Sequence, residues 1–292
     1  MAWEAIVMPL DYDRAYKLEQ SQKFKHWVDS VSTNYAALSI KDIKTSDVVI
    51  ILCMEKEVLN YAPEKRLDFM TYRPSDILGR PLNATEEKNA PVRLYVAGRL
   101  QIPLQNPRVS IIGTREPSFD GLSKAYEIAG ELARRGIIIV SGLARGIDTS
   151  AHKGAIDAGG KTIAVLGTPL DQFYPYQNMT LQKKIMKEHL AITEFPIGYK
   201  VRPKNFVMRD RTMALLSDAS IIIEAGDSSG TLYQGWETLR LGRPLFIWKK
   251  VFENSGLHWP EKMLKYGAIK LEDINQIIDE ISFGAPVFEI RA

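Results

Sequence analysis

The chain has 292 residues, of which 45% are hydrophobic and 25% charged, and its formal net charge is +3. This is the composition of an ordinary soluble globular protein, long enough for one large domain or for a large and a small one. The mild positive charge permits nucleic-acid binding without requiring it. The lone cysteine, Cys53, excludes an internal disulfide and fits a reducing cytoplasm.

Neither a targeting segment nor a membrane span is evident in the sequence. The start of the chain, at 1–17, lacks the basic region and the unbroken apolar region of a signal peptide. The longest apolar runs are strand-sized, well short of the roughly 18 residues that indicate a membrane span. We therefore expect a cytoplasmic protein with no membrane partner.

Residues 1–92 do not share the pattern of the rest, and we expect a small N-terminal domain followed by an irregular connector. The pattern predicts a helix over Asp13–Ser30 and a buried strand over Asp47–Cys53. Prolines interrupt the stretch 61–92 repeatedly, which favours a connector without regular structure. No motif in this part indicates its role.

In 93–292, short apolar, β-branched runs alternate with helical patterns. Such runs are typical of parallel strands buried on both faces, and their short connections favour a doubly wound α/β sheet, mostly parallel and Rossmann-like. The tail, 256–283, is expected to add a short strand and a closing amphipathic helix. The expected strands are 109–112, 137–140, 162–166, 190–193, 220–224 and 244–248, and the expected helices are about 121–135, 148–158, 178–189, 208–217 and 231–242.

Four polar clusters follow predicted strands or open predicted helices. They are Gly113–Arg115, Ser141–Asp148, Phe206–Arg211 and Ser228–Thr231. In an open parallel sheet such junctions meet at one edge, where backbone N–H groups and helix N-termini can bind an anion. Glycine lets the backbone approach a ligand, and arginine can hold a phosphate through two hydrogen bonds. The clusters therefore predict a phosphate-binding edge, although each could also be an ordinary turn.

Two features of this region allow a second interpretation. Asp148 and His152 lie one helical turn apart and could form an acid–base pair, but such a pair is more often a structural hydrogen bond that fixes a loop. The stretch Ala155–Thr162 fits a relaxed phosphate-loop pattern, yet a helix precedes it and a strand follows, the reverse of a working P-loop. We interpret Gly159 and Gly160 as a helix C-cap and turn.

The stretch 199–211 is strongly basic and carries interleaved aromatic residues. Such a stretch suits single-stranded nucleic acid, because the charges follow phosphates while a ring stacks on an unpaired base, worth roughly 1–3 kcal/mol per base. The alternative is a solvated loop whose Phe206 is buried. Its basic residues are Lys200, Arg202, Lys204, Arg209 and Arg211, with Asp210 as the one acid.

No motif indicates a metal, a cofactor or a catalytic group. The four histidines are scattered and there is no second cysteine, so no zinc-site spacing exists. The G-x-S-x-G elbow of serine hydrolases is absent as well. We expect a protein without catalytic residues, bound metal or cofactor.

Taken together, the motifs between 93 and 279 resemble the bacterial DNA-processing protein A family, also called Smf. The resemblance implies a Rossmann-like domain that binds single-stranded DNA and helps load a RecA-type recombinase during natural transformation. A homodimer is expected, because one set of pockets engages only a few nucleotides. The matching motifs are Gly113–Arg115, Ser141–Asp148 with Ala151 and His152, Thr162–Gly167, Phe173–Pro175, Ser229–Gly230 and Gly242–Pro244.

By this resemblance, basic residues and one aromatic residue contact DNA, and small residues shape a phosphate pocket. The expected DNA contacts are Arg115, Arg145, Lys204, Phe206, Arg209 and Arg211, and the expected pocket residues are Gly113, Thr114, Ser141, Gly142, Ser229 and Gly230. The chain departs from the family at Asp210, where a neutral amide is usual. A carboxylate there would repel a phosphate or pair with a flanking arginine. We also expect no winged-helix domain of the kind that many members carry, because the tail is short.

The alternative function is a nucleotide-binding sensor or a nucleotide N-glycoside hydrolase of the wider superfamily. Lysine-decarboxylase-like phosphoribohydrolases use the loop P-G-G-x-G-T-x-x-E with a catalytic glutamate. Aligning their Gly-Thr with Gly230 and Thr231 places Gln234 at the glutamate position, and Glu237 lies one turn further on. The orientation of Glu237, into the pocket beside Arg115 or away to a salt bridge, distinguishes the two classes.

Overall fold

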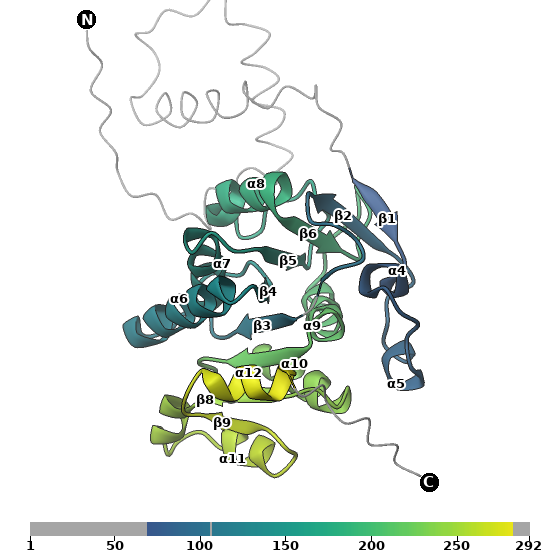
Figure 1. The fold of residues 1–292 in the computed structure, drawn as a ribbon. Helices are drawn as coiled ribbons and strands as arrows, with labels where there is room; N and C mark the ends of the chain where they lie inside the picture. Colours follow the sequence, from purple (N-terminus) through teal and green to yellow (C-terminus); the bar gives the residue numbers. More distant parts are fainter. Residues whose placement is uncertain (1–68, 106, 283–292) are drawn as a thin grey trace, which may run out of the picture. The chain divides into compact units, whose positions relative to one another are not determined.

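The computed structural model describes residues 69–105 and 107–282, and these belong to one compact unit (Figure 1). The helix expected at 13–30 and the strand expected at 47–53 lie outside the described residues, so they stay predictions. The same holds for the small N-terminal domain to which they were assigned.

A nine-stranded sheet runs through the described residues, in the order β1-β2-β6-β5-β4-β3-β7-β8-β9. Strands β1 and β2 join one side of the sheet in antiparallel pairs, whereas the remaining neighbours are parallel. The strands are β1 (Met70–Tyr72), β2 (Leu94–Gly98), β3 (Arg108–Ile112), β4 (Ile138–Ser141), β5 (Thr162–Leu166), β6 (Leu190–Thr193), β7 (Ala219–Ile222), β8 (Leu245–Trp248) and β9 (Ile269–Leu271).

The central strands confirm the predicted mostly parallel α/β sheet. Every residue of β3 to β8 is buried, as continuous apolar runs require when both faces of a parallel sheet are covered. The order β5-β4-β3-β7-β8-β9 is that of a Rossmann sheet, in which the chain reverses its direction of travel between the first and fourth strands. Here that switch point lies between β3 and β7.

Helices cover both faces of the sheet. Helices α6, α7 and α8 follow β3, β4 and β5 on one face, while α9 and α10 pack against each other on the opposite face, as right-handed crossovers require (Figure 1). The helices are α4 (Pro74–Leu78), α5 (Ala84–Glu87), α6 (Phe119–Arg134), α7 (Ile147–Asp157), α8 (Met179–Glu188), α9 (Lys204–Leu216), α10 (Thr231–Arg240), α11 (Trp259–Leu264) and α12 (Asn275–Ser282), with 3-10 turns at Tyr176–Asn178 and Lys249–Glu253.

The expectation of an irregular connector is wrong for the part of 61–92 that the structure describes. Strand β1 pairs with β2, and helices α4 and α5 follow it, so this segment belongs to the same unit as the sheet. Pro74 is the first residue of α4, a position that proline favours because its missing N–H would have no partner there. The proline that suggested a break instead begins a helix.

The glycine pair after α7 forms a turn, as predicted. Gly159 has a φ of +75°, and the N–H of Gly160 donates to the carbonyl of Ala155 at 2.9 Å, so the pair closes the helix before β5 begins. The loop therefore does not face a helix N-terminus as a P-loop does.

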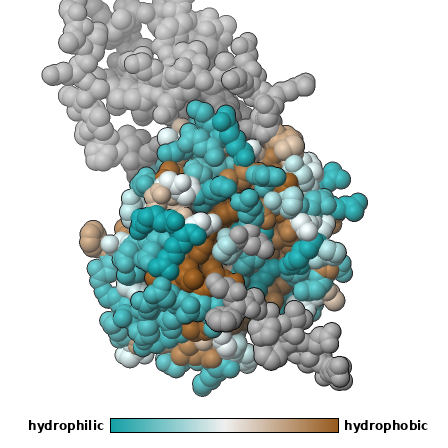
Figure 2. Space-filling model, in the orientation of Figure 1, coloured by the Kyte–Doolittle hydropathy of each residue, from teal (hydrophilic) through white to brown (hydrophobic). Residues whose placement is uncertain are grey.

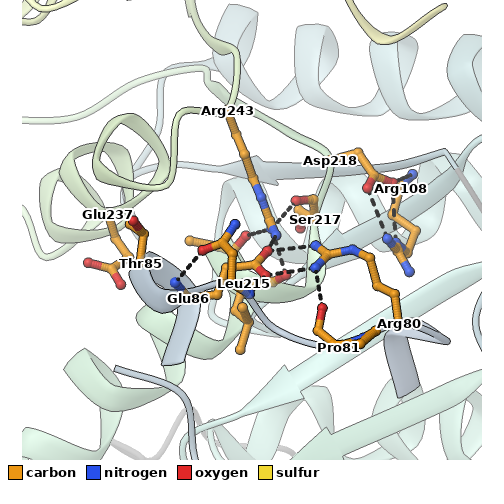
Figure 3. Close-up of polar contacts among 12 residues, drawn as sticks. Arg80, Pro81, Thr85, Glu86, Arg108, Leu215, Ser217, Asp218, Glu237 and Arg243 are labelled. Atoms are coloured by element: carbon orange, nitrogen blue, oxygen red, sulfur yellow. Dashed lines mark hydrogen bonds and ion pairs between the residues drawn. The ribbon is translucent and has the colours of Figure 1, made fainter. Parts of the chain in front are cut away.

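Glu86 organises a buried ionic cluster, here called the Glu86 clasp, that holds the C-terminal end of α9 (Figure 3). Glu86 accepts hydrogen bonds from Arg80 at 2.6 and 2.7 Å and from Arg243 at 2.7 Å. Arg243 also donates to the carbonyls of Ala214, Leu215 and Ser217, which end the helix. The clasp satisfies carbonyls that a helix end leaves without partners and fixes α9 at the amino edge of the sheet.

The surface of the described unit is mixed. Figure 2 shows that hydrophilic residues cover most of one face, with apolar residues gathered near its centre. Between residues 69 and 282, leaving out 106, none of the helices has the length and apolar character needed to cross a membrane.

Candidate nucleic-acid interface

Loops from neighbouring strands meet where β3, β4 and β5 end, called the carboxyl edge below. They are 113–118 after β3, 142–146 after β4 and 167–175 after β5, and the first turn of α9 joins them. The loops are tied together, since Asn178, in the 3-10 turn that follows the third loop, donates to the Leu143 carbonyl at 2.8 Å. The carboxyl edge is therefore a fixed surface rather than a set of independent turns.

Phe206, on the first turn of α9, lies at the centre of this edge. Its ring covers Gly167, where an added Cβ would come within 2.6 Å of the ring. The guanidinium of Arg115 lies over the same ring, 5.7 Å from its centroid, and the ring of Tyr174 is 5.2 Å away at an interplanar angle of 47°. Arg115, Phe206 and Tyr174 thus form one contiguous group, in which Phe206 is half-buried and the other two are exposed.

Three further predicted cations are exposed around this group. Arg145 lies 3.9 Å from the carboxylate of Glu116, which links the second loop to the first. Lys204 is the first residue of α9, and Arg211 follows about two turns later on the same side of the helix. No side chain caps the N-terminus of α9, and the positive end of its helix dipole adds to the positive potential there.

Arg209 differs from the other predicted contacts because it is buried, with an exposed fraction of 6%. Its Nη1 lies 3.8 Å from Oδ2 of Asp148, and its Nε lies 2.8 Å from Oδ1 of Asp210. Gly142 provides the space, since an added Cβ there would lie 1.3 Å from Nη1. Asp210, the departure from the family pattern, therefore pairs with the flanking arginine.

The two carboxylates of this cluster have raised pKa values because they are buried. Burial raises the pKa of Asp210 to about 6, although the charges of Arg209 and Arg115 oppose the shift. Burial likewise raises the pKa of Asp148, against the charge of Arg209 and the N–H groups that it accepts. The cluster therefore takes up a proton in mildly acidic solution.

Asp148 and His152 have separate partners. Asp148 accepts from the N–H groups of Gly142 at 3.1 Å and Ala144 at 3.2 Å, so it fixes the loop after β4. His152 Nδ1 lies 2.7 Å from the hydroxyl of Thr162, and burial lowers the pKa of His152 to about 3. Both side chains are structural in this arrangement. Within the described ranges, no group of three or more His, Cys, Asp or Glu residues is placed to hold a metal ion.

The predicted phosphate-pocket residues surround the switch point, but not all of them face outward. Ser141 is buried, and its hydroxyl donates to the Ile111 carbonyl at 2.7 Å. The hydroxyl of Thr231 donates to the Gly113 carbonyl at 3.1 Å, which joins the start of α10 to the turn after β3. Ser229 and Gly230 come directly before that helix. A Cβ built on Gly230 would have no atom within 4 Å, so there is open space beside this residue.

Glu224 occupies the N-terminus of α6 at the switch point. Its carboxylate accepts hydrogen bonds from the Ser118 hydroxyl and from the Ser118 N–H, the latter at 2.9 Å. Gly121 makes room for it, because an added Cβ would come within 2.5 Å of the carboxyl carbon. The Glu224 carbonyl accepts the Thr114 N–H at 2.7 Å. A carboxylate of the chain itself thus lies where dinucleotide-binding sheets hold a phosphate.

Glu237 points away from the carboxyl edge to a salt bridge. It accepts from Arg240 at 2.6 and 2.8 Å and from Asn89 at 3.1 Å, and Figure 3 shows it beside Thr85 of α5. Burial alone would raise the pKa of Glu237, but these hydrogen bonds outweigh it and lower the pKa. Gln234 is buried and donates to the Ser110 hydroxyl at 2.9 Å. Neither residue is placed to act as a catalytic glutamate.

The carboxyl edge contains two residues to which the sequence assigned no role. Tyr174 appeared only as part of a family motif, and its position next to a proline gave no sign that its ring would be exposed. Glu224 ends the predicted strand 220–224, and an acid beside a glycine-rich loop was the signal that could have identified it.

The family model and the relatives that are similar in sequence agree on one family. The model of the family "DNA recombination-mediator protein A" matches residues 79–282. The DNA processing protein DprA of Bacillus subtilis is 26% identical over 271 residues, which cover 90% of this chain and 91% of that protein.

Two solved structures are similar as well. DprA of Streptococcus pneumoniae has a TM-score of 0.63 at 27% identity, over 94% of this chain and 99% of that one. DprA of Helicobacter pylori, for which a single-stranded DNA binding mode is described, has a TM-score of 0.60 at 25% identity, over 73% of this chain and 95% of that one. The family match covers well over half of the sequence, and the chain therefore belongs to the DNA recombination-mediator protein A family.

Proposed function

We propose that this protein binds single-stranded DNA at the carboxyl edge of its sheet, without chemical turnover, and that it acts in DNA recombination or uptake. The observation that carries the proposal is the group of Arg115, Phe206 and Tyr174, in which an exposed cation and an exposed ring contact a half-buried ring. The single-stranded DNA binding described for the Helicobacter pylori relative supports it.

The exposed cations would hold the DNA backbone. Arg115, Arg145, Lys204 and Arg211 project from separate loops and from α9, so they can follow several phosphates of one strand. Bases would turn toward the aromatic side chains, and this requires unpaired bases because a duplex hides their faces. Each phosphate that is neutralised should contribute about −0.7 to the slope of log affinity against log salt on a single strand.

Arg209 would act through its neighbours rather than by touching a phosphate. It is buried between Asp148 and Asp210, and Asp148 in turn fixes the loop that carries Arg145. A buried pair of this kind is costly to break, because the partner left behind keeps an uncompensated charge. We therefore assign Arg209 a positioning role within the interface.

Small residues of the predicted pocket would shape backbone turns. Gly113 and Gly142 make close contacts that exclude a Cβ, with nearest distances of 2.5 and 1.3 Å. The N–H groups of Thr114 and Ser229 already donate to the Glu224 and Gly226 carbonyls, at 2.7 and 3.0 Å, so these residues and Gly230 would fix the turns that the DNA backbone passes. Recruitment of a RecA-type recombinase, a homodimer and a cytoplasmic location are proposed from the family resemblance.

The alternative, a nucleotide sensor or an N-glycoside hydrolase, fits these observations less well. The glutamate of a hydrolase has no counterpart at the edge, since Glu237 is paired with Arg240 and Gln234 is buried. The N-terminus of α6, which would receive the phosphate of a small nucleotide, already holds Glu224. Single-stranded DNA that binds across the exposed loops needs neither a catalytic glutamate nor a free N-terminus of α6.

The test is fluorescence anisotropy of labelled single-stranded and duplex DNA over a salt series. The variants are Arg115→Ala and Lys204→Ala, with Lys161→Ala as the control, because Lys161 is an exposed cation at the opposite edge, just before β5. We expect a preference for single strands, weaker binding with a shallower salt slope in the first two variants, and no change in the control. Equal binding by all four proteins, or no binding at low salt, would refute the proposal.

A further inference from the structure

Tyr174 presents an exposed ring in the interface, with 45% of its surface accessible. We propose that Tyr174 is a base-stacking platform for an unpaired nucleobase and that Phe206 mainly supports it. This inference rests on the proposed function, since it names a contact that single-stranded DNA makes. It shifts the main stacking role from Phe206, which the sequence singled out, to a residue on the loop after β5.

Phe206 has little free surface to offer a base. One side of its ring covers Gly167, which comes so close that no Cβ would fit. The Arg115 guanidinium lies over the ring at 5.7 Å, and Tyr174 lies against it at 5.2 Å. A base could approach Phe206 only by displacing one of these neighbours, whereas the outer face of Tyr174 is free.

The loop that carries Tyr174 is held on both sides. Before it, the side chain of Gln172 donates to the Tyr199 carbonyl at 3.3 Å, and Gln182 donates to the Gln172 carbonyl at 3.2 Å. After it, Asn178 is bonded to the loop that follows β4. A ring held in place before binding loses little conformational freedom when a base stacks on it, which makes it an efficient platform.

The surroundings favour a base over an apolar partner. Among the described residues, Tyr174 is an exposed aromatic residue, and its ring contacts that of Phe206. The Arg115 guanidinium lies over the Phe206 ring, 5.7 Å from its centroid, so a phosphate held there leaves the attached base near the two rings. An apolar peptide bound here would cover the Arg115 guanidinium with uncharged surface. Binding would then cost free energy, because the charge would lose its water without gaining a partner.

The experiment compares Tyr174→Ala with Tyr174→Phe, using a short oligothymidylate that carries one 2-aminopurine as a stacking probe. Tyr126→Ala is the matched control, since Tyr126 is similarly exposed at 43% but bonds to Asp157 at the far end of α7. Tyr174→Ala should weaken binding by between about fivefold and about a hundredfold, the equivalent of roughly 1–3 kcal/mol, with an unchanged salt slope. Tyr174→Phe should retain affinity and the quenching of 2-aminopurine, as should the control.

The readouts separate this inference from the proposed function. If Arg115→Ala weakens binding and reduces the salt slope while Tyr174→Ala binds like wild type, the stacking role is overturned and the DNA-binding proposal stands. If the wild-type protein does not bind the oligonucleotide, the proposed function fails and this inference with it. Thermal melting of Tyr174→Ala should match wild type, because the side chain lies on the surface.

Discussion

Replacing Glu86 by glutamine should remove much of the stability of the described unit at neutral pH. Burial alone would raise the pKa of Glu86, but hydrogen bonds from Arg80 and the Asn83 N–H, together with the charge of Arg243, lower it from 4.5 to about 2. A difference of this size between the folded and unfolded states corresponds to about 3 kcal/mol of stability. Glutamine keeps the shape and cannot carry the charge.

The sign of the pH dependence follows from the direction of the shift. Because the folded-state pKa of Glu86 lies below its unfolded value, the stabilisation is complete above that value and is lost as the pH falls toward about 2. Glu86→Gln should therefore cost about 3 kcal/mol at neutral pH and only about half of that near pH 3. The loss at neutral pH also reflects the charges of Arg80 and Arg243, which remain in the clasp without their partner.

The assay is urea unfolding followed by tryptophan fluorescence at both pH values. Glu87→Gln is the control, because it makes the same substitution at the adjacent, exposed position of the same helix. The expected result is a large loss for Glu86→Gln at neutral pH, a smaller loss in acid and almost none for Glu87→Gln. Equal stabilities of the two variants at neutral pH would refute the role of the clasp, and so would a loss that does not shrink in acid.

Three further outcomes follow from the carboxyl edge. Gly142→Ala should lower the free energy of unfolding by about 1–3 kcal/mol and weaken DNA binding, because the new Cβ would overlap Arg209; calorimetry and anisotropy measure the two effects. Wild-type affinity for DNA should rise as the pH falls through about 6, since protonation of Asp210 removes one of the two carboxylate charges beside Arg209 and makes the interface more positive, and an anisotropy series should show a weaker dependence for Asp210→Asn. Glu224→Ala should let inorganic phosphate bind at the N-terminus of α6, which calorimetry would detect; no gain over wild type contradicts the blocking role of that carboxylate.

The central part of the fold could be predicted because parallel strands buried on both faces leave a strong signature. The predicted strands 162–166 and 190–193 agree with β5 and β6 residue for residue. The side of the sheet formed by β1 and β2 was missed, since the pairing of two short strands over a long separation leaves no local pattern. The break expected at Pro74 is the start of α4, because a proline that begins a helix and a proline that interrupts one look alike in a single sequence.

At the site, the sequence correctly indicated where the motif residues would gather but not which way each would face. The arginines at 115 and 209 looked equivalent, yet one is exposed and the other buried. Arg209 lies inside α9, which begins at Lys204 and not near 208 as expected. On this helix Arg209 shares a side with the buried residues Asn205, Met213 and Leu216, so the periodicity turns it inward, whereas Arg115 lies on a loop.

The distribution of charge also argues for a polymer over a small nucleotide. The chain's own carboxylates occupy the places where backbone N–H groups could bind a phosphate. Glu224 accepts a hydrogen bond at the N-terminus of α6, and Asp148 accepts hydrogen bonds from N–H groups of the loop after β4. The cations left exposed, Arg115, Arg145 and Lys204, project from three different segments of the edge. A mononucleotide could reach few of them at once. A single strand presents regularly spaced phosphates and can engage them together, so this placement of charge favours DNA.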